Sequence, residues 1–210
     1  MSPATAIWNQ RYAKPAEVLR HAQYEPWLDR WQPVIAGRPG RALDLGCGPG
    51  WDTEVLRRWG FQVTALDVSR AAIELTKARN PGAIHVVADL RDLGCLSGGF
   101  DLLVASLSLH YFNQEETSTI FNAIHGQLLP GGFFVFRVNA FDDVESGAPD
   151  ESSAWECVSV GGIVKQFFTR EKIAEALGGR YRVLSEEKLE TWRYGHRKTF
   201  FEVIAKKHPH

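Results

Sequence analysis

The sequence has few cysteines, almost no net charge and no long apolar run. Its three cysteines, Cys47, Cys95 and Cys157, are too few and too widely spaced for a disulfide framework or a zinc site. Lys and Arg number 24 against 25 Asp and Glu, a net charge of −1, whereas proteins that coat nucleic acid carry a basic excess. Apolar runs such as 133–136 are far shorter than the roughly 20 residues of a membrane span, and the N-terminus lacks a signal-peptide pattern. These absences predict a cytoplasmic protein without a metal, a nucleic-acid partner or a membrane partner.

The composition is that of an ordinary globular protein. Of the 210 residues, 44% are hydrophobic and 23% are charged, which excludes wholesale disorder and a fibre. This length suits one domain. We expect a single domain with four parts: an N-terminal helical cap (1–36), a core (41–138), an acidic segment (139–162), and a C-terminal helix with a hairpin (163–210).

Short apolar runs alternate with helical patterns through the core. Five runs have the length and composition of buried strands: 41–44, 61–66, 84–88, 100–105 and 132–138. Strands joined by helical crossovers form a parallel sheet with helices on both faces. Two further runs, 181–189 and 198–206, are closely joined and are therefore expected to be antiparallel. The pattern predicts an α/β fold, a doubly wound Rossmann-like mixed sheet of five parallel strands and a C-terminal antiparallel hairpin.

Glycines and acids follow the predicted strands. In such sheets ligands bind beyond the carboxyl ends of the strands, so the residues at these ends are the candidates: Asp44, Gly46, Gly48 and Gly50 after the first strand, Asp67 after the second, Asp89 after the third and Ser106 after the fourth. Glycine lets the backbone approach a ligand closely because no Cβ intervenes. The pattern predicts a ligand site at this edge.

Two nucleotide-type ligands fit such an edge. A dinucleotide fingerprint has the spacing G-x-G-x-x-G, but Trp51 stands where its third glycine belongs. Pro49 removes a backbone donor that would hold phosphate, and Asp44 would repel a pyrophosphate. These departures favour a ligand with a nucleoside, a positive charge and no phosphate.

At these positions the chain resembles the class I S-adenosylmethionine-dependent methyltransferases. Residues 43–50 (LDLGCGPG) resemble the first motif of that family, and Asp67 resembles its acid after the second strand. The pair Asp89–Leu90 resembles the pair that follows the third strand, and residues 128–132 resemble the turn before the fifth strand. Residues 8–12 (WNQRY) and the last strand are similar to the small bacterial group of tellurite-resistance and thiopurine-type enzymes.

The resemblance implies S-adenosylmethionine as the cofactor and a role for each residue at the edge. Asp67 would accept the ribose hydroxyls, and Asp89 the adenine amino group. The expected cofactor-binding residues are Trp8, Tyr12, Asp44, Gly46, Gly48, Gly50, Asp67, Val68, Asp89, Leu90 and Ser106.

The acceptor side is less patterned. His110 is a natural general base, although a structural histidine fits equally well. Trp51, Tyr111 and Trp155 are candidates for contact with the acceptor. Cys47 is interpreted as a buried filler and not as a nucleophile.

The segment 139–162 carries six acids and no Lys or Arg. Because unpaired carboxylates resist burial, we expect a mobile lid that becomes ordered on binding and helps to select the acceptor, with Phe141 or Trp155 turned inward. A merely solvated loop is the alternative.

The function predicted is methyl transfer to a small-molecule acceptor by in-line displacement, performed by a monomer or weak homodimer. The sequence leaves open a non-catalytic S-adenosylmethionine-binding regulator or partner subunit. An NAD(P)-type oxidoreductase is disfavoured by the glycine spacing.

Overall fold

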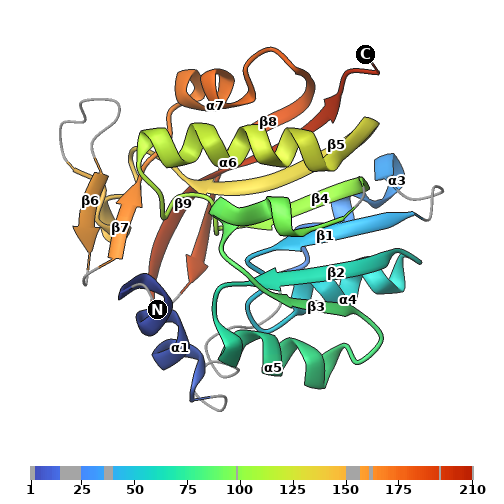
Figure 1. The fold of residues 1–210 in the computed structure, drawn as a ribbon. Helices are drawn as coiled ribbons and strands as arrows, with labels where there is room; N and C mark the ends of the chain where they lie inside the picture. Colours follow the sequence, from blue (N-terminus) through green and yellow to red (C-terminus); the bar gives the residue numbers. More distant parts are fainter. Residues whose placement is uncertain are drawn as a thin grey trace. The chain divides into compact units, whose positions relative to one another are not determined.

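The computed structural model describes residues 3–14, 25–35, 40–97, 99–149, 157–160, 163–193 and 195–209 (Figure 1). The chain forms two compact units, Met1–Val104 and Ala105–His210. The single domain expected from the sequence, with its four parts, stays a prediction.

The first unit is built from parallel strands with helices alongside. Its elements, in chain order, are α1 (Pro3–Tyr12), η1 (Asp29–Trp31), α3 (Gln32–Ile35), β1 (Arg41–Leu45), α4 (Trp51–Arg58), β2 (Gln62–Asp67), α5 (Arg70–Arg79), β3 (Ile84–Val87), η2 (Leu90–Cys95) and β4 (Phe100–Ser106), whose last two residues belong to the second unit. The strand order is β3-β2-β1-β4, and each neighbouring pair is parallel. Helix α4 packs on β1 and β2, α5 packs on β2 and β3, and α1 packs on α5 (Figure 1).

Local signals set the helix ends of this unit. Helix α4 follows Gly50, whose φ of 81° suits glycine, and Gly60 follows its end with a φ of 90°. The hydroxyl of Ser69 accepts a hydrogen bond from the Ala72 N–H at 3.2 Å and so caps α5. The apolar faces of these helices are buried against strands of which β1 and β2 are almost wholly buried.

The second unit is built around antiparallel strands. Its elements are α6 (Gln114–Gln127), β5 (Leu128–Asn139), η3 (Val144–Ser146), β6 (Cys157–Val160), β7 (Ile163–Gln166), α7 (Arg170–Leu177), β8 (Tyr181–Arg193) and β9 (His196–Lys207). The strand order is β5-β9-β8 with antiparallel pairing, and β6 and β7 form a separate antiparallel pair. Phe121 of α6 packs edge-on against Phe134 and Phe136 of β5.

The predicted fold class is confirmed. Seven of the described strands make up a mixed sheet that is parallel in the first unit and ends in an antiparallel hairpin. The strands of the hairpin are longer than predicted, because β8 extends to Arg193, β9 begins at His196 and these two residues are paired. The segment 139–162 was expected to be irregular, but it contains η3 and β6. No described helix has the length and apolar character needed to span a membrane.

Candidate functional site

The carboxyl ends of β1, β2 and β3 meet at one edge of the first unit. The register places Asp44 beside Ala65, and the Leu66 carbonyl accepts hydrogen bonds from the N–H groups of Gly46 (2.8 Å) and Cys47 (3.0 Å). The Asp67 carbonyl accepts one from the Ala88 N–H at 3.1 Å. The glycine loop (residues 46–50) and the segments after β2 and β3 are therefore neighbours, as the sequence predicted.

Asp67 connects the end of β2 to the glycine loop. Its Oδ2 accepts a hydrogen bond from the Gly48 N–H at 3.0 Å, and its Oδ1 accepts one from the Ser69 N–H at 2.8 Å. The side chain is buried, and burial raises its pKa above the ordinary value despite these two donors. Each carboxylate oxygen can accept about two hydrogen bonds, so Asp67 keeps acceptor capacity for hydroxyl groups of a ligand.

Helix α1 is docked beside the glycine loop. A Cβ at Gly48 would lie 3.0 Å from the Tyr12 hydroxyl oxygen, and the φ of this glycine is +52°. Tyr12 stacks on Trp8 of the same helix, with ring centroids 6.2 Å apart. Helix α1 thus places Tyr12 beside the glycine loop, where the sequence predicted it.

Asn9 was missed by the sequence interpretation. Its Oδ1 accepts hydrogen bonds from the Ser69 hydroxyl at 3.0 Å and from the Ala71 N–H at 3.3 Å, so it joins α1 to the N-terminus of α5. Its position between Trp8 and Tyr12 in the WNQRY element is the signal that could have identified it.

Asp44 is a buried acid without a cationic partner among the described residues. Only 2% of it is exposed, and its Oδ2 accepts a hydrogen bond from the Thr53 hydroxyl at 2.6 Å. Burial, followed by the negative charge of Asp52, raises the pKa of Asp44 to about 8, with a smaller contribution from Asp67. This carboxyl group is therefore largely protonated at neutral pH until a positive charge approaches it.

The carbonyls of the glycine loop face α5. The Gly48 carbonyl accepts a hydrogen bond from the Thr76 hydroxyl at 2.7 Å, and the Gly50 carbonyl accepts one from the Asn80 amide at 2.9 Å. Between them, the Pro49 carbonyl accepts one from Arg79 Nε at 3.2 Å. The Arg79 guanidinium also lies 3.5 Å from the ring centroid of Trp51, which begins α4.

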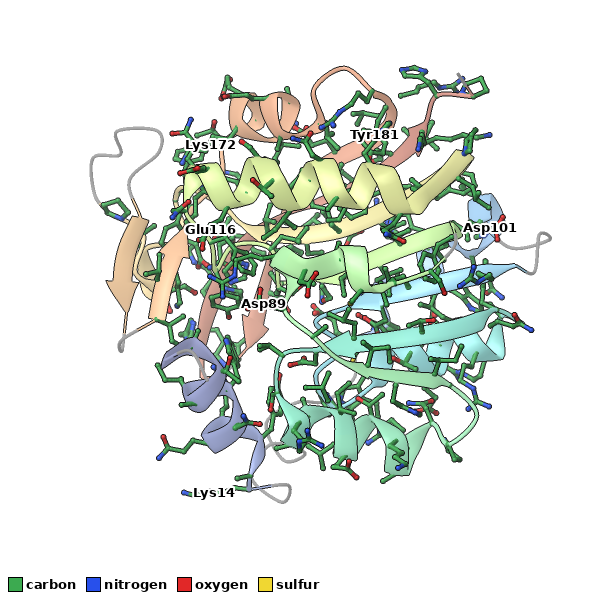
Figure 2. All side chains as sticks on the ribbon, viewed as in Figure 1. Lys14, Asp89, Asp101, Glu116, Lys172 and Tyr181 are labelled. Carbon is green, nitrogen blue, oxygen red and sulfur yellow. The ribbon has the colours of Figure 1, made fainter. Side chains whose placement is uncertain are left out.

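Asp89 lies at the end of β3, where the chain enters η2 (Figure 2). Both of its carboxylate oxygens accept hydrogen bonds from the Arg91 side chain, at 2.9 and 2.6 Å, and Oδ1 also accepts one from the Arg91 N–H at 3.0 Å. Burial by itself would raise the pKa of this carboxyl group, but the contacts with Arg91 lower the pKa below its ordinary value. Leu90 beside it is buried, and Val68 is half-buried.

Three further candidates belong to the second unit. The Ser106 hydroxyl accepts a hydrogen bond from Arg137 Nη2 at 2.9 Å. His110 is 1% exposed, and its Nδ1 has no hydrogen-bond partner among the described residues. Burial, followed by the charges of Lys198 and Lys165, lowers the pKa of His110 well below its ordinary value, so the imidazole is neutral at neutral pH. The Tyr111 ring lies against it, with centroids 4.2 Å apart.

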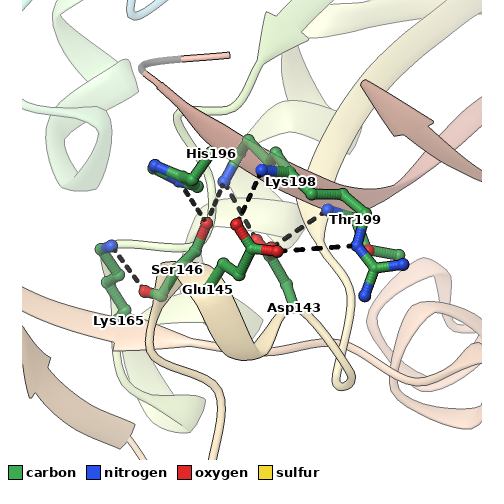
Figure 3. Close-up of polar contacts among 8 residues, drawn as sticks. Asp143, Glu145, Ser146, Lys165, His196, Lys198 and Thr199 are labelled. Carbon is green, nitrogen blue, oxygen red and sulfur yellow. Dashed lines mark hydrogen bonds and ion pairs between the residues drawn. The ribbon is translucent and has the colours of Figure 1, made fainter. Parts of the chain in front are cut away.

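The acids of the segment 139–149 have counter-charges, which corrects the premise behind the predicted lid. Asp143 forms a buried ion pair with Lys198 at 3.1 Å and accepts a hydrogen bond from the Thr199 N–H at 3.0 Å (Figure 3). Glu145 pairs with Arg197, and Asp142 pairs with Lys188. Each cation comes from the C-terminal hairpin, more than 40 residues away in sequence. The other three acids and Trp155 lie outside the described residues.

Cys47 is a packing residue, as predicted. It is buried with Ala65 and Ile73, and its Sγ lies 3.5 Å from the Thr76 hydroxyl. Burial, followed by the charges of Asp44 and Asp67, raises the pKa of the thiol well above its ordinary value. A thiol in this setting is a poor nucleophile.

Comparison with known proteins agrees with this geometry. Residues 43–136, which contain the glycine loop, Asp67 and Asp89, match the sequence model of a family described as "Methyltransferase domain". This part of the chain is therefore similar to methyltransferase domains. Two solved structures of similar fold hold S-adenosylhomocysteine, a ligand with a nucleoside and no phosphate.

Two relatives carry names that describe a reaction. The chain is 29% identical over 144 residues to malonyl-[acyl-carrier protein] O-methyltransferase of Enterobacter lignolyticus, a match that covers 69% of this chain and 55% of that protein. It is 35% identical over 144 residues to trans-aconitate 2-methyltransferase of Mycolicibacterium gilvum, covering 67% of this chain and 52% of that protein. In these matches the chain spans about half the length of the curated relatives.

Solved structures of other methyltransferases share the fold. The 1,6-didemethyltoxoflavin N1-methyltransferase of Burkholderia thailandensis, with 1,6-didemethyltoxoflavin and S-adenosylhomocysteine bound, aligns with a TM-score of 0.75 at 20% identity, over 98% of this chain and 87% of that one. TehB of Haemophilus influenzae aligns with a TM-score of 0.70 at 15% identity, over 91% and 65%. The resemblance to small bacterial methyltransferases is therefore confirmed at the level of fold.

Proposed function

We propose that this protein transfers the methyl group of S-adenosylmethionine to a small-molecule acceptor. The observation that carries the proposal is the edge formed by the glycine loop and Asp67, beside which Asp44 is buried without a cation among the described residues. A ligand that combines a nucleoside diol with an ammonium and a sulfonium group matches these features. The relatives that methylate trans-aconitate and 1,6-didemethyltoxoflavin support a small acceptor.

Each cofactor-binding role follows the family pattern. Asp67 would accept the ribose hydroxyls, because its oxygens retain acceptor capacity. Asp89 would accept the adenine amino group while the Leu90 N–H donates to the ring, and Val68 and Leu90 would flank the ring. The Gly46 backbone would lie beside the methionine portion.

Four other residues complete the proposed cofactor site. Asp44 would lie near the ammonium and sulfonium groups, since a cation favours the ionised form of this buried acid. Tyr12 and Trp8 would close the site from α1, and Ser106 would contribute from the end of β4.

The bound cofactor supplies a methyl group on a sulfonium, which is a strong leaving group. The protein then has to align the acceptor atom with the methyl carbon and exclude water, and such positioning can supply much of the barrier reduction. Where the acceptor atom still carries a proton, methylation makes that proton more acidic, so a weak base suffices to take it. We assign this role to His110, whose neutral imidazole has an unpartnered Nδ1. Trp51 and Tyr111 are proposed to contact the acceptor.

Calorimetry tests the cofactor. S-Adenosylmethionine and S-adenosylhomocysteine should bind with micromolar dissociation constants, about −8 kcal/mol at 1 μM, while NAD and NADP should give no comparable heat. Tight binding of NAD or NADP with no heat from S-adenosylhomocysteine would overturn the proposal.

Turnover tests the transfer itself. Incubation with S-adenosylmethionine and a panel of small carboxylic acids and nitrogen heterocycles should produce S-adenosylhomocysteine with at least one acceptor. Tight cofactor binding without product across a broad panel would favour the non-catalytic regulator that the sequence left open.

A further inference from the structure

Three consecutive carbonyls of the glycine loop are held by one turn of α5 and the residue that follows it. Gly48, Pro49 and Gly50 each accept a hydrogen bond from a side chain, namely Thr76, Arg79 and Asn80 respectively. The distances are 2.7, 3.2 and 2.9 Å. Spacings of three and four residues place these side chains on the same face of a helix.

The contact between loop and helix is tightly packed. Thr76 and Asn80 are fully buried. A Cβ at Gly50 would lie 2.8 Å from both Asn80 Nδ2 and Thr76 Cγ2, and the φ of Gly50 is +81°. A side chain at position 50 would therefore be strained and would also push the loop away from α5.

The hydrogen bonds fix the direction in which the loop presents its polar groups. A carbonyl that accepts a hydrogen bond from α5 cannot turn toward a ligand on another side of the loop. Pro49 has no N–H, and the Gly50 N–H is used within the loop by the Cys47 carbonyl at 2.9 Å. The conformation of the loop is thus determined by α5 before any ligand binds.

We propose that Thr76, Arg79 and Asn80 are positioning residues that set the affinity for the amino-acid portion of the cofactor without touching it. This inference rests on the proposed function, in which the loop lies beside the methionine portion while Asp67 and Asp89 bind the nucleoside. The donors of α5 stabilise the loop in its binding conformation, so the ligand does not have to order it. Their loss weakens binding of a ligand that reaches the loop more than binding of one that ends at the sulfur.

Two probes separate these portions: S-adenosylhomocysteine, and 5′-methylthioadenosine, which lacks the amino acid. Thr76→Val removes the hydroxyl at nearly constant volume, and Asn80→Asp places an acceptor against the Gly50 carbonyl. Thr76→Ser keeps the hydroxyl. Thr117→Val is the matched control, because Thr117 is also buried and its hydroxyl donates to Gln166 Oε1 at 3.0 Å in the second unit.

Binding of both probes is measured by calorimetry, alongside the unfolding midpoint of each variant. Thr76→Val should weaken S-adenosylhomocysteine binding about three- to tenfold, and Asn80→Asp should weaken it more. Methylthioadenosine binding should change less than about twofold. Thr76→Ser and Thr117→Val should bind both probes as the unaltered protein does.

Two results would overturn the inference while leaving the proposed function intact. In the first, Thr76→Val and Asn80→Asp bind S-adenosylhomocysteine as tightly as the control variant Thr117→Val does. The other is a parallel loss of both probes, which would make these residues general supports of the edge. If the unaltered protein binds neither probe, the proposed function itself fails.

Discussion

Asp44 and Asp143 are both buried carboxyl groups, but their surroundings differ. Asp143, in the second unit, is 1% exposed and faces the Lys198 ammonium at 3.1 Å and the Thr199 N–H at 3.0 Å. Asp44, in the first unit, is 2% exposed and faces a hydroxyl and two further acids, with no cation among the described residues.

The difference indicates that Asp143 stabilises the fold, whereas Asp44 is placed to bind a ligand. A buried charge needs a partner, and Asp143 has one within its own chain. Asp44 is neutral at neutral pH instead, because burial and nearby acids raise its pKa to about 8. Such an unbalanced acid at a ligand-binding edge is suited to a cationic ligand.

Removal of the partner of Asp143 should have the largest effect. Lys198→Met keeps most of the apolar stem but leaves Asp143 buried without its cation. Breaking a buried ion pair in this way costs about 3–5 kcal/mol of unfolding free energy. Urea unfolding at pH 7 measures this loss.

A double variant provides the control for that loss. Adding Asp143→Asn to Lys198→Met removes the uncompensated charge and keeps an acceptor for the Thr199 N–H, so most of the stability should return. If the single variant Lys198→Met is as stable as the unaltered protein, Asp143 does not need its cation and does not differ from Asp44 in this respect.

Asp44→Asn should have a smaller effect that depends on pH. The pKa of Asp44 is raised from 3.8 to about 8 in the folded protein, so its contribution to stability is fully present below about pH 4 and is lost as the pH rises toward 8. The amide has no such titration and can still accept from the Thr53 hydroxyl. The variant should therefore gain stability relative to the unaltered protein between pH 5 and 7, by about 2–3 kcal/mol. Urea unfolding of both proteins at pH 5 and pH 7 measures this gain. If the unfolding free energies of the two proteins change with pH in the same way, the pKa of Asp44 is not raised.

The parts that the sequence predicted well depend on residues close together in the chain. Ser69 and Thr169 cap α5 and α7, and a sequence can indicate such caps because a cap needs only an oxygen and an N–H three residues away. The glycine loop and Asp67 could likewise be placed together, because parallel strands align their carboxyl ends.

The parts that it missed depend on side chains that meet only in the folded chain. Asn9 reaches α5 across about 60 residues, and Lys198 reaches Asp143 across 55. No local signal marks Lys198 as the partner of Asp143, and Asn9 is marked only by its place in the WNQRY element. The acidic segment was therefore interpreted as unpaired and mobile, although the cations of its described acids, Asp142, Asp143 and Glu145, belong to the C-terminal hairpin.

Proton release on cofactor binding tests most directly whether Asp44 becomes ionised when a cationic ligand binds beside it. The measurement is calorimetry of S-adenosylmethionine binding at pH 7 in two buffers of different ionisation enthalpy. A cation near Asp44 lowers its pKa, so binding should release up to about one proton, and the affinity should rise from pH 6 to about pH 8 and then level off. Asp44→Asn should bind more weakly and release none. Equal proton release by the unaltered protein and Asp44→Asn would contradict the account.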